Sequence, residues 1–389
     1  MDYNKFLSDK VKGIKPSGIR KFFDMLSTMK DVISLTVGQP DFPTPYHISN
    51  AAVESITKNK TYYTSNSGLL ELREGISDFL CRRYGLHYEA NGEIIVTVGG
   101  SEAIDMAFRA ILNPGDEVIV PEPCFVCYAP LIEVMGGVAV PLYTSVNDKF
   151  KVTKEKLLPL ITPKTKAIVL SYPNNPTGAI MTKEDLEAIC PIITENDILV
   201  LSDEIYSELT YGREHVSIAS LPGMRERTVV VNGFSKAYAM TGWRLGYVCA
   251  PSDIMTQILK LHQYGIMCAP TASQFAGVEA IKNGDADVKY MTDHYNRRRT
   301  YVVKRLNEMG LECFEPEGAF YVFPRIDGFG ISSEEFCQKL LDEKRVAIVP
   351  GDAFGEGSEG FARISYAYSI DHLTIALDRI EEFVKELKK

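Results

Sequence analysis

Short apolar runs alternate with segments of helical periodicity along residues 93–231 of this 389-residue chain. The runs are rich in β-branched residues and end in small or polar residues, as buried strands do. The expected strands are residues 93–98, 117–120, 138–142, 166–170, 197–202 and 228–231, with one more at 245–250. The expected helices among them are residues 101–112, a helix that ends near residue 131, and residues 183–193 with Thr182 as N-cap. This alternation indicates an α/β domain, a mainly parallel sheet flanked by helices.

The run ILVLS at residues 198–202 is apolar except for its last residue, which suits a strand covered on both faces of the sheet. Right-handed crossovers place the loops that follow parallel strands along one edge of the sheet, and ligands bind at that edge. We therefore expect the chemically unusual residues that follow these strands to share one site.

The segments on either side of this alternation predict further helices. Residues 17–29 carry apolar side chains at helical spacing, and residues 33–45 (ISLTVGQPDFPTP) are an extended crossing broken by prolines. Residues 311–389 mix strand-like and helix-like runs. The other expected helices are residues 47–58, residues 69–84 and a long helical stretch that runs with few breaks from residue 254, through Pro270, to about residue 309.

A chain of 389 residues is long enough for two domains of ordinary size. The α/β alternation favours a large domain of residues 46–280. We expect residues 1–45 to join residues 281–389 in a smaller α+β domain.

Composition and charge exclude several classes of protein. The formal net charge is -9, and no basic block is long enough to follow a phosphate backbone, so we expect no nucleic-acid partner. The basic triplet Arg297, Arg298 and Arg299 reads as a solvated or interface face of a helix. No window approaches the ~18 apolar residues of a membrane span, and the polar N-terminus does not resemble a signal peptide. We expect a cytoplasmic protein without a membrane partner.

The eight cysteines are scattered, and Cys124 and Cys127 form the only CxxC pair. No second pair has matching spacing, so we expect no metal site. The pair follows a Pro-Glu-Pro turn, which does not suit redox use, and free buried thiols in a reducing compartment are expected.

Residues 229–246 (VVVNGFSKAYAMTGWRLG) carry the first candidate for chemistry. A lysine in a loop is ordinarily an exposed surface residue, but Lys236 directly follows a buried strand. A lysine at such a strand exit is a candidate nucleophilic amine, and Ser235 and Arg244 could hold an anion beside it. This arrangement suits a phosphate-bearing aldehyde cofactor that is held as a Schiff base.

Two further loops follow predicted strands. Residues 98–102 (VGGSE) join a strand to a helix, where bare backbone amides favour an anion, although a plain Gly-Ser cap is equally compatible. Residues 171–178 (SYPNNPTG) form a rigid turn that would hold Asn175 as a fixed hydrogen-bond donor.

Two charged residues lie in or at the end of apolar strands. Asp203 ends the strand ILVLS, where a carboxylate needs a partner such as a protonated ring nitrogen. The alternative is a cap of a following helix. Arg363 lies within FARIS, where its planar fork suits a carboxylate ligand, and the alternative is a buried structural ion pair.

These motifs, VGGSE, YPNNPTG, SDEIY, NGFSKAYAMTGWRLG and FARISYA, occur in an order that resembles the class I/II aminotransferases. These are fold-type I enzymes that depend on pyridoxal 5'-phosphate (PLP), similar to aspartate and aromatic aminotransferases. The resemblance runs from about residue 17 to the C-terminus. It implies a large α/β domain, a smaller α+β domain and a homodimer.

The resemblance also implies a role for each matching residue. Lys236 would hold the cofactor as an aldimine and move the proton, and Asp203 would bind the pyridine nitrogen. Phe125 would stack on the ring, in a position where relatives often carry Tyr or Trp. Asn175 and Tyr206 would contact the phenolic oxygen, and Asn175 also belongs to the substrate site. The remaining implied residues are Gly100, Ser101, Glu102, Ser235 and Arg244 for the phosphate, Arg363 and Gly38 for the substrate carboxylate, and Tyr63 for the phosphate of the neighbouring subunit.

The activity implied is transfer of an amino group between an L-amino acid and a 2-oxo acid, with 2-oxoglutarate as the expected acceptor and ping-pong kinetics. A PLP-dependent carbon–sulfur β-lyase shares the fold and the lysine, and is the main alternative. A PLP-binding transcriptional regulator would need an added DNA-binding domain, and a dinucleotide dehydrogenase would need a GxGxxG motif.

The donor stays open among aspartate, aromatic and acetyl-diaminopimelate types. The N-terminal segment with SGIRKF resembles that branch of the family, in which it can close over the site as a lid. Arg297 is a candidate to bind an acidic side chain of the substrate, although an arginine on a helix surface is the simpler interpretation.

Overall fold

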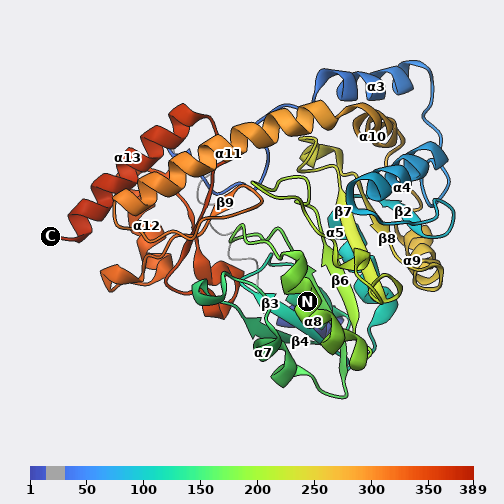
Figure 1. Cartoon of the computed structure of the whole chain (residues 1–389), viewed down its shortest axis with the longest axis horizontal. Helices are drawn as coiled ribbons and strands as arrows, with labels where there is room; N and C mark the ends of the chain where they lie inside the picture. Colours follow the sequence, from blue (N-terminus) through green and yellow to red (C-terminus); the bar gives the residue numbers. More distant parts are fainter. Residues whose placement is uncertain (15–30) are drawn as a thin grey trace.

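A seven-stranded sheet forms the centre of the larger part of the molecule. The computed structural model describes residues 1–14 and 31–389 (Figure 1). The helix expected at residues 17–29, and with it the lid, lies outside the described residues. The strands in spatial order are β2 (Ile94–Thr97), β8 (Gly246–Cys249), β7 (Thr228–Gly233), β6 (Leu199–Asp203), β5 (Thr165–Ser171), β3 (Glu117–Glu122) and β4 (Val138–Tyr143).

The pairing in this sheet is mainly parallel, as predicted. Neighbours from β7 to β4 run parallel, and β8 alone runs against both of its neighbours, β7 and β2. The two faces of the sheet are buried in different cores: Ile168 and Leu170 of β5 enter one cluster, whereas Ala167 and Val169 enter another. This burial on both faces explains why the strands are apolar runs without alternation.

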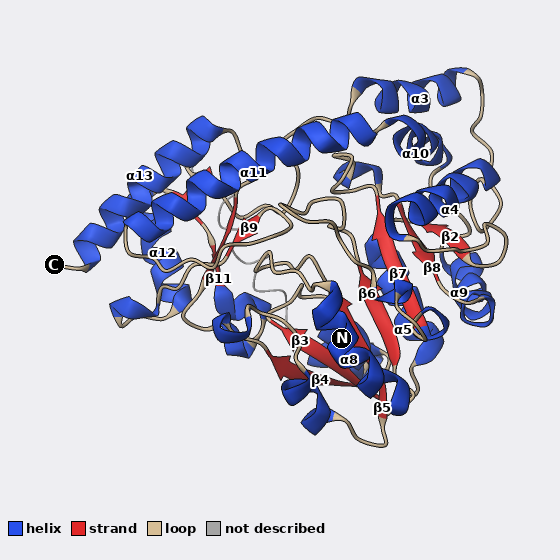
Figure 2. Cartoon of the chain, in the orientation of Figure 1, coloured by secondary structure: helices blue, strands red, loops and turns tan. Residues whose placement is uncertain are grey.

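Helices cover the sheet on both sides (Figure 2). Thr182 caps α8 as predicted, through a capping box with Asp185. The helices of this part of the chain are α3 (Tyr46–Thr57), α4 (Leu70–Tyr84), α5 (Gly100–Ile111), α6 (Tyr128–Val134), α7 (Lys154–Leu157), α8 (Lys183–Glu195), α9 (Ser252–Gly265) and α10 (Thr271–Asn283).

The long helical stretch expected, with few breaks, from residue 254 to about residue 309 consists of three helices, and it does not run through Pro270 as expected. Pro270 is the N-cap of α10, and Gly284 separates α10 from α11 (Asp285–Glu308). Proline lacks the backbone N–H that a helix interior needs and is tolerated at a helix start, so the chain breaks there.

The remaining strands form two small sheets beside α11, α12 (Ser333–Lys344) and α13 (Ile370–Leu387) (Figure 1). In one, β1 (Ile33–Ser34) pairs in parallel with β10 (Val346–Ala347). In the other, β12 (Ala362–Ser365) lies between β11 (Val349–Pro350) and β9 (Tyr321–Val322), antiparallel to both. The strands of the large sheet thus fall within residues 46–280, and those of the small sheets fall outside this range.

Short elements complete the described chain. The first helix, α1, spans Asp9–Gly13. The 3-10 helices are η1 (Asn4–Phe6), η2 (Val146–Asp148), η3 (Leu158–Leu160), η4 (Ile218–Ser220), η5 (Arg225–Arg227), η6 (Thr241–Trp243), η7 (Asp327–Phe329), η8 (Gly351–Phe354) and η9 (Glu356–Ser358). Among the helices described, none has the length and apolar character needed to cross a bilayer.

Candidate active site

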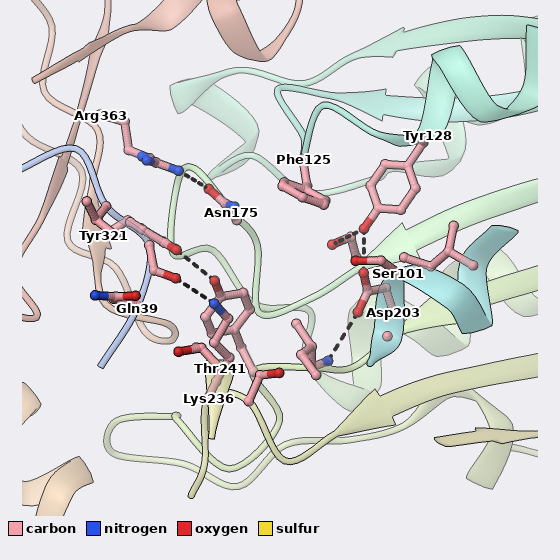
Figure 3. A pocket seen from close by; sticks show the side chains of 18 of the residues that line it. Gln39, Ser101, Phe125, Tyr128, Asn175, Asp203, Lys236, Thr241, Tyr321 and Arg363 are labelled. Carbon is pink, nitrogen blue, oxygen red and sulfur yellow. Dashed lines mark hydrogen bonds between the residues drawn. The ribbon is translucent and has the colours of Figure 1, made fainter. Parts of the chain in front are cut away.

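A cavity of about 350 Å³ lies where the ends of β5, β6 and β7 meet the start of α5. The small sheets close its other side with Tyr321 and Arg363, and the segment before α3 contributes residues 36–39 (Figure 3). The sequence-predicted residues that line it are Gly38, Gly100, Ser101, Phe125, Asn175, Asp203, Tyr206, Ser235, Lys236, Arg244 and Arg363. Their convergence follows from the parallel sheet, whose carboxyl ends share one edge.

Lys236 follows β7 and lines the cavity. Its Nζ donates a hydrogen bond to the carbonyl oxygen of Gly38, 2.5 Å away. Burial and, after it, the positive charges of Arg363 and Arg244 lower the pKa of Lys236 to about 8, whereas Asp203 acts in the opposite direction. The amine is therefore poised to lose its proton near neutral pH, as a nucleophile or proton carrier requires.

Asp203 ends β6 and is buried. Its Oδ2 accepts a 2.7 Å hydrogen bond from the hydroxyl of Tyr128, and its Oδ1 accepts one of 3.2 Å from the backbone N–H of Ile205. Burial raises the pKa of Asp203, and these two donors oppose that rise. Residues 205–208 form a turn, so the alternative of a helix cap is wrong. No ion pair of Asp203 occurs within residues 1–14 and 31–389, and a cationic ligand would satisfy it.

Tyr128 is a site residue that the sequence reasoning missed. It lies at the start of α6, three residues after Phe125, and is fully buried against the aspartate. The rings of Phe125 and Tyr128 meet edge to face, with centroids 6.3 Å apart. A tyrosine three residues from a predicted stacking ring, at the start of a short helix, was the signal that could have found it.

The N-terminus of α5 borders the cavity next to Arg244. Gly100 and Ser101 begin this 12-residue helix, whose first amides have no intrahelical partner. Arg244 reaches over the preceding loop, because a Cβ on Gly99 would lie 2.7 Å from its Nη2. Its Nη1 donates to the carbonyl of Thr241 at 3.1 Å, and it has no acidic partner among the residues that the structure describes. Arg244 is therefore available to bind an anion.

Glu102 and Tyr63 do not line the cavity. Glu102 lies in the first turn of α5, and its carboxylate accepts from the backbone N–H of Val98 and lies 2.7 Å from Nδ1 of the buried His262. It thus fixes the loop. Tyr63 lies between α3 and α4 with 81% of its surface exposed.

Arg363 is buried in β12. Its Nη1 donates to Oδ1 of Asn175 at 2.9 Å, and its Nη2 donates to the carbonyl of Thr36. Its Nε is buried and has no hydrogen-bond partner within residues 1–14 and 31–389. The described residues supply no carboxylate to it, so the structural ion pair considered as an alternative is not found. A buried guanidinium without a counter-charge is a site for an incoming carboxylate.

The other residues singled out earlier lie outside the cavity. Arg297 is exposed on α11, while Arg298 pairs with Asp41 at 2.7 Å and Arg299 pairs with Glu315 at 2.9 Å. Cys124 and Cys127 are free thiols. Among the residues described, no group of three or more side chains could hold a metal ion.

Comparison with known proteins identifies the family. The family described as aminotransferase class I and II matches residues 30–380. A probable N-acetyl-LL-diaminopimelate aminotransferase of Bacillus subtilis is 47% identical and covers 98% of this chain and 96% of its own. An aspartate aminotransferase of Pyrococcus abyssi is 46% identical over 98% of this chain and 99% of its own.

Solved structures agree with this assignment. An aromatic aminotransferase from Pyrococcus horikoshii superposes with a TM-score of 0.91 at 46% identity, covering 94% of this chain and 99% of that one. An aspartate aminotransferase from Thermus thermophilus with maleate gives 0.92 at 38% identity, covering 97% and 99%. These relatives support amino-group transfer rather than the β-lyase alternative. The chain belongs to the class I and II aminotransferases, shares their α/β fold and acts on amino and 2-oxo acids.

Proposed function

We propose that this aminotransferase uses PLP, which Lys236 binds covalently. The observation that carries the proposal is the presence in one cavity of a buried lysine with a pKa of about 8 and a buried aspartate without a counter-cation. Three residues of the cavity, Ser101, Ser235 and Arg244, form an anion subsite that fits the phosphate of such a cofactor. Glu102 would support this subsite through the loop that it holds.

When bound, the cofactor supplies an aldehyde for the amine and a ring that withdraws electrons. The chain's own residues prepare the site for this chemistry. Asp203 keeps a ring nitrogen protonated, and Tyr128 holds Asp203 in its charged form. Asn175 and Tyr206 line the cavity and would hydrogen-bond the ring oxygen, and Phe125 would cover the ring. Together they stabilise negative charge that develops during proton transfer.

Arg363 binds the α-carboxylate of the substrate, assisted by Asn175 and the backbone of Gly38. With the carboxylate held there, Lys236 as a neutral amine would accept the α-proton of the substrate and carry it within the cavity. The carbonyl of Gly38, which now accepts from Lys236 Nζ, keeps the amine oriented toward the cavity. We propose 2-oxoglutarate as acceptor and a donor of aspartate, aromatic or acetyl-diaminopimelate type, because relatives of all three kinds are similar to this chain.

We further propose a homodimer with shared sites. Three tyrosines are highly exposed in the single chain: Tyr62 at 77%, Tyr63 at 81% and Tyr264 at 94%. Exposed aromatic side chains such as these favour burial against a partner. The loop that carries Tyr63 is tied to the end of α9 by a hydrogen bond from Asn66 to the carbonyl of Met267. In the dimer, Tyr63 would reach the phosphate of the other subunit. The unpaired state of all eight cysteines supports a cytoplasmic location.

The test is a panel of amino donors with 2-oxoglutarate, followed by cofactor absorbance and by the 2-oxo acid formed. Lys236→Ala should remove both turnover and the absorbance of the lysine-bound cofactor. The matched control, Lys260→Ala on the exposed face of α9, should keep both. Persistence of both signals in Lys236→Ala would overturn the assignment. Release of pyruvate and ammonia from cystathionine without an acceptor would support the β-lyase instead.

A further inference from the structure

Tyr321, the first residue of β9, contacts several residues that the proposed function uses but has itself no assigned role. Its hydroxyl oxygen lies 2.7 Å from that of Tyr206, and both side chains are buried at the wall of the cavity (Figure 3). The guanidinium of Arg363 lies 4.6 Å from the centre of the Tyr321 ring. A side chain on Gly38 would collide with the same hydroxyl, because its Cβ would lie 2.2 Å away.

The packing fixes where this hydroxyl points. The rings of Tyr206 and Tyr321 meet nearly edge to face, at 77° with centroids 5.8 Å apart, and Phe320 packs against both. The approach of Gly38 blocks a second side of the hydroxyl. Of the described side chains, Tyr206 is the one that hydrogen-bonds to it. This packing holds the two hydroxyl groups within hydrogen-bond distance of each other.

The direction of this bond decides what Tyr206 can do. Each phenol has one proton, and either oxygen can be the donor. If Tyr206 donated to Tyr321, it would have no proton left for a ligand in the cavity. If Tyr321 donates, the Tyr206 oxygen is satisfied and its own proton is free to point into the cavity. An electron-rich oxygen on the ligand selects the second arrangement.

We propose that Tyr321 is a positioning residue that donates to Tyr206 and thereby directs the Tyr206 proton to the ring oxygen of the bound cofactor. The inference rests on the proposed function, because it assigns the ring oxygen to the Tyr206 side of the cavity. A hydroxyl that accepts a hydrogen bond becomes a stronger donor, by about 10–30% per bond in a buried chain of hydrogen bonds. Tyr321 would thus act without touching the cofactor itself, by strengthening the hydrogen bond from Tyr206 to the ring oxygen.

The test is a pH titration of the cofactor absorbance in Tyr321→Phe, which keeps the ring beside Arg363 and removes only the hydroxyl. The proton that controls this absorbance is shared between the ring oxygen and the nitrogen of Lys236. A weaker bond from Tyr206 leaves the ring oxygen more basic, so the proton is held more tightly. We expect the pKa of the absorbance change to rise by about a few tenths of a unit, the scale of the cooperative effect. An unchanged pKa would overturn the proposal.

A double-mutant cycle shows whether Tyr321 acts through Tyr206. Tyr206→Phe should raise the same pKa by more, and adding Tyr321→Phe to it should cause no further rise. A full additional rise in the Tyr206→Phe background would show that Tyr321 acts by another route. The control, Tyr366→Phe, removes a buried hydroxyl that donates to the carbonyl of Ala319 and should leave the pKa unchanged.

Incorporation of 3-fluorotyrosine at position 321 provides a test that does not depend on the folding of the Phe variant. Fluorine makes the phenol more acidic and a stronger donor at nearly the same size. The absorbance pKa should then fall, opposite to the shift in Tyr321→Phe, and a rise would contradict the proposed direction of donation. The absence of any Lys236-dependent absorbance in the unmodified enzyme would instead overturn the proposed function.

Discussion

The hydroxyl of Tyr128 donates a 2.7 Å hydrogen bond to Asp203 although 75 residues separate them in the chain. Ser171 Oγ lies 3.0 Å from the same hydroxyl and can donate to it in turn. The aspartate is thus supported by a short chain of buried hydroxyl groups. This support matters because burial alone raises the pKa of Asp203, and a protonated aspartate could not keep a ring nitrogen charged.

Replacing Tyr128 with Phe should therefore narrow the pH range of activity from the acid side. The hydroxyl now lowers the pKa of Asp203, so its removal raises that pKa, and Asp203 becomes protonated at a higher pH than before. One buried hydrogen bond to a charged group corresponds to a shift of about one pKa unit. In a plot of kcat/KM against pH, the acid limb should therefore shift to higher pH by about one unit. The maximal rate should fall by less than the rate at acid pH.

A matched control for this experiment is Tyr88→Phe. The Tyr88 hydroxyl is also buried but has no hydrogen-bond partner in the described part of the chain, so its loss should leave the pH profile unchanged. An equal acid-limb shift in both variants would mean that the effect of Tyr128 is a general result of losing a buried hydroxyl.

The depressed pKa of Lys236 predicts how the protein without cofactor takes up PLP. Only the neutral amine attacks the aldehyde, so the rate should rise with pH and level off above about 8, the pKa of Lys236. The positive charge of Arg363 is a contributor to this low pKa after burial. Arg363→Gln should therefore raise the pKa of Lys236, and the plateau should begin at higher pH. Stopped-flow absorbance measures both curves, and a rate independent of pH between 6 and 10, about two units either side of 8, would contradict the prediction.

Gly38→Ala should destabilise the site by overpacking. The added Cβ would lie 2.2 Å from the Tyr321 hydroxyl oxygen but 3.3 Å from the ring carbon behind it. We expect a loss of about 1–3 kcal/mol in the free energy of unfolding, together with a fall in kcat/KM, since Gly38 also accepts from Lys236. Thermal unfolding and steady-state kinetics measure the two effects.

The second substitution Tyr321→Phe removes the oxygen that collides and should restore part of the lost stability. The control is Gly328→Ala, because a Cβ on Gly328 meets nothing within 4 Å. The geometry requires that the Cβ added in Gly38→Ala collide with the Tyr321 hydroxyl. If the effects of Gly38→Ala and Tyr321→Phe on stability were additive, this collision would be contradicted.

The parts of the site that could be predicted are those that local sequence brings to one edge of the sheet. Asn175, Asp203 and Lys236 each follow an apolar strand, and parallel strands place such residues together. Arg363 was predictable for a different reason, because an arginine in an apolar strand needs a partner. The α/β fold was predictable from the same alternation of strands and helices.

The residues that sequence reasoning missed depend on contacts between distant segments. Tyr321 meets Tyr206 across 115 residues, and the pattern FYVFP around it indicates only a buried strand. The Glu102 carboxylate turns to His262, 160 residues away, although its place in the first turn of α5 is typical of an anion-site residue. Such pairings follow from how the small sheets and α9 pack on the large sheet, which no local pattern specifies.

Tyr63 predicts a shared active site that can be restored by combining two defective variants, Tyr63→Phe and Lys236→Ala. Its side chain is 81% exposed and outside the cavity of its own chain, so in the proposed dimer it serves the other subunit. Tyr63→Phe should weaken cofactor binding by about tenfold, the value of one hydrogen bond to a charged group.

A hybrid dimer of one Tyr63→Phe chain and one Lys236→Ala chain separates the two contributions. One of its sites carries both substitutions, whereas the other has Lys236 from one chain and Tyr63 from its partner. Mixing after mild dissociation should therefore give tight cofactor binding in about half of the hybrid's sites, by the isologous symmetry of such a dimer. Mixing Tyr63→Phe with itself is the control, and a hybrid that binds the cofactor no more tightly would place Tyr63 outside the partner's site.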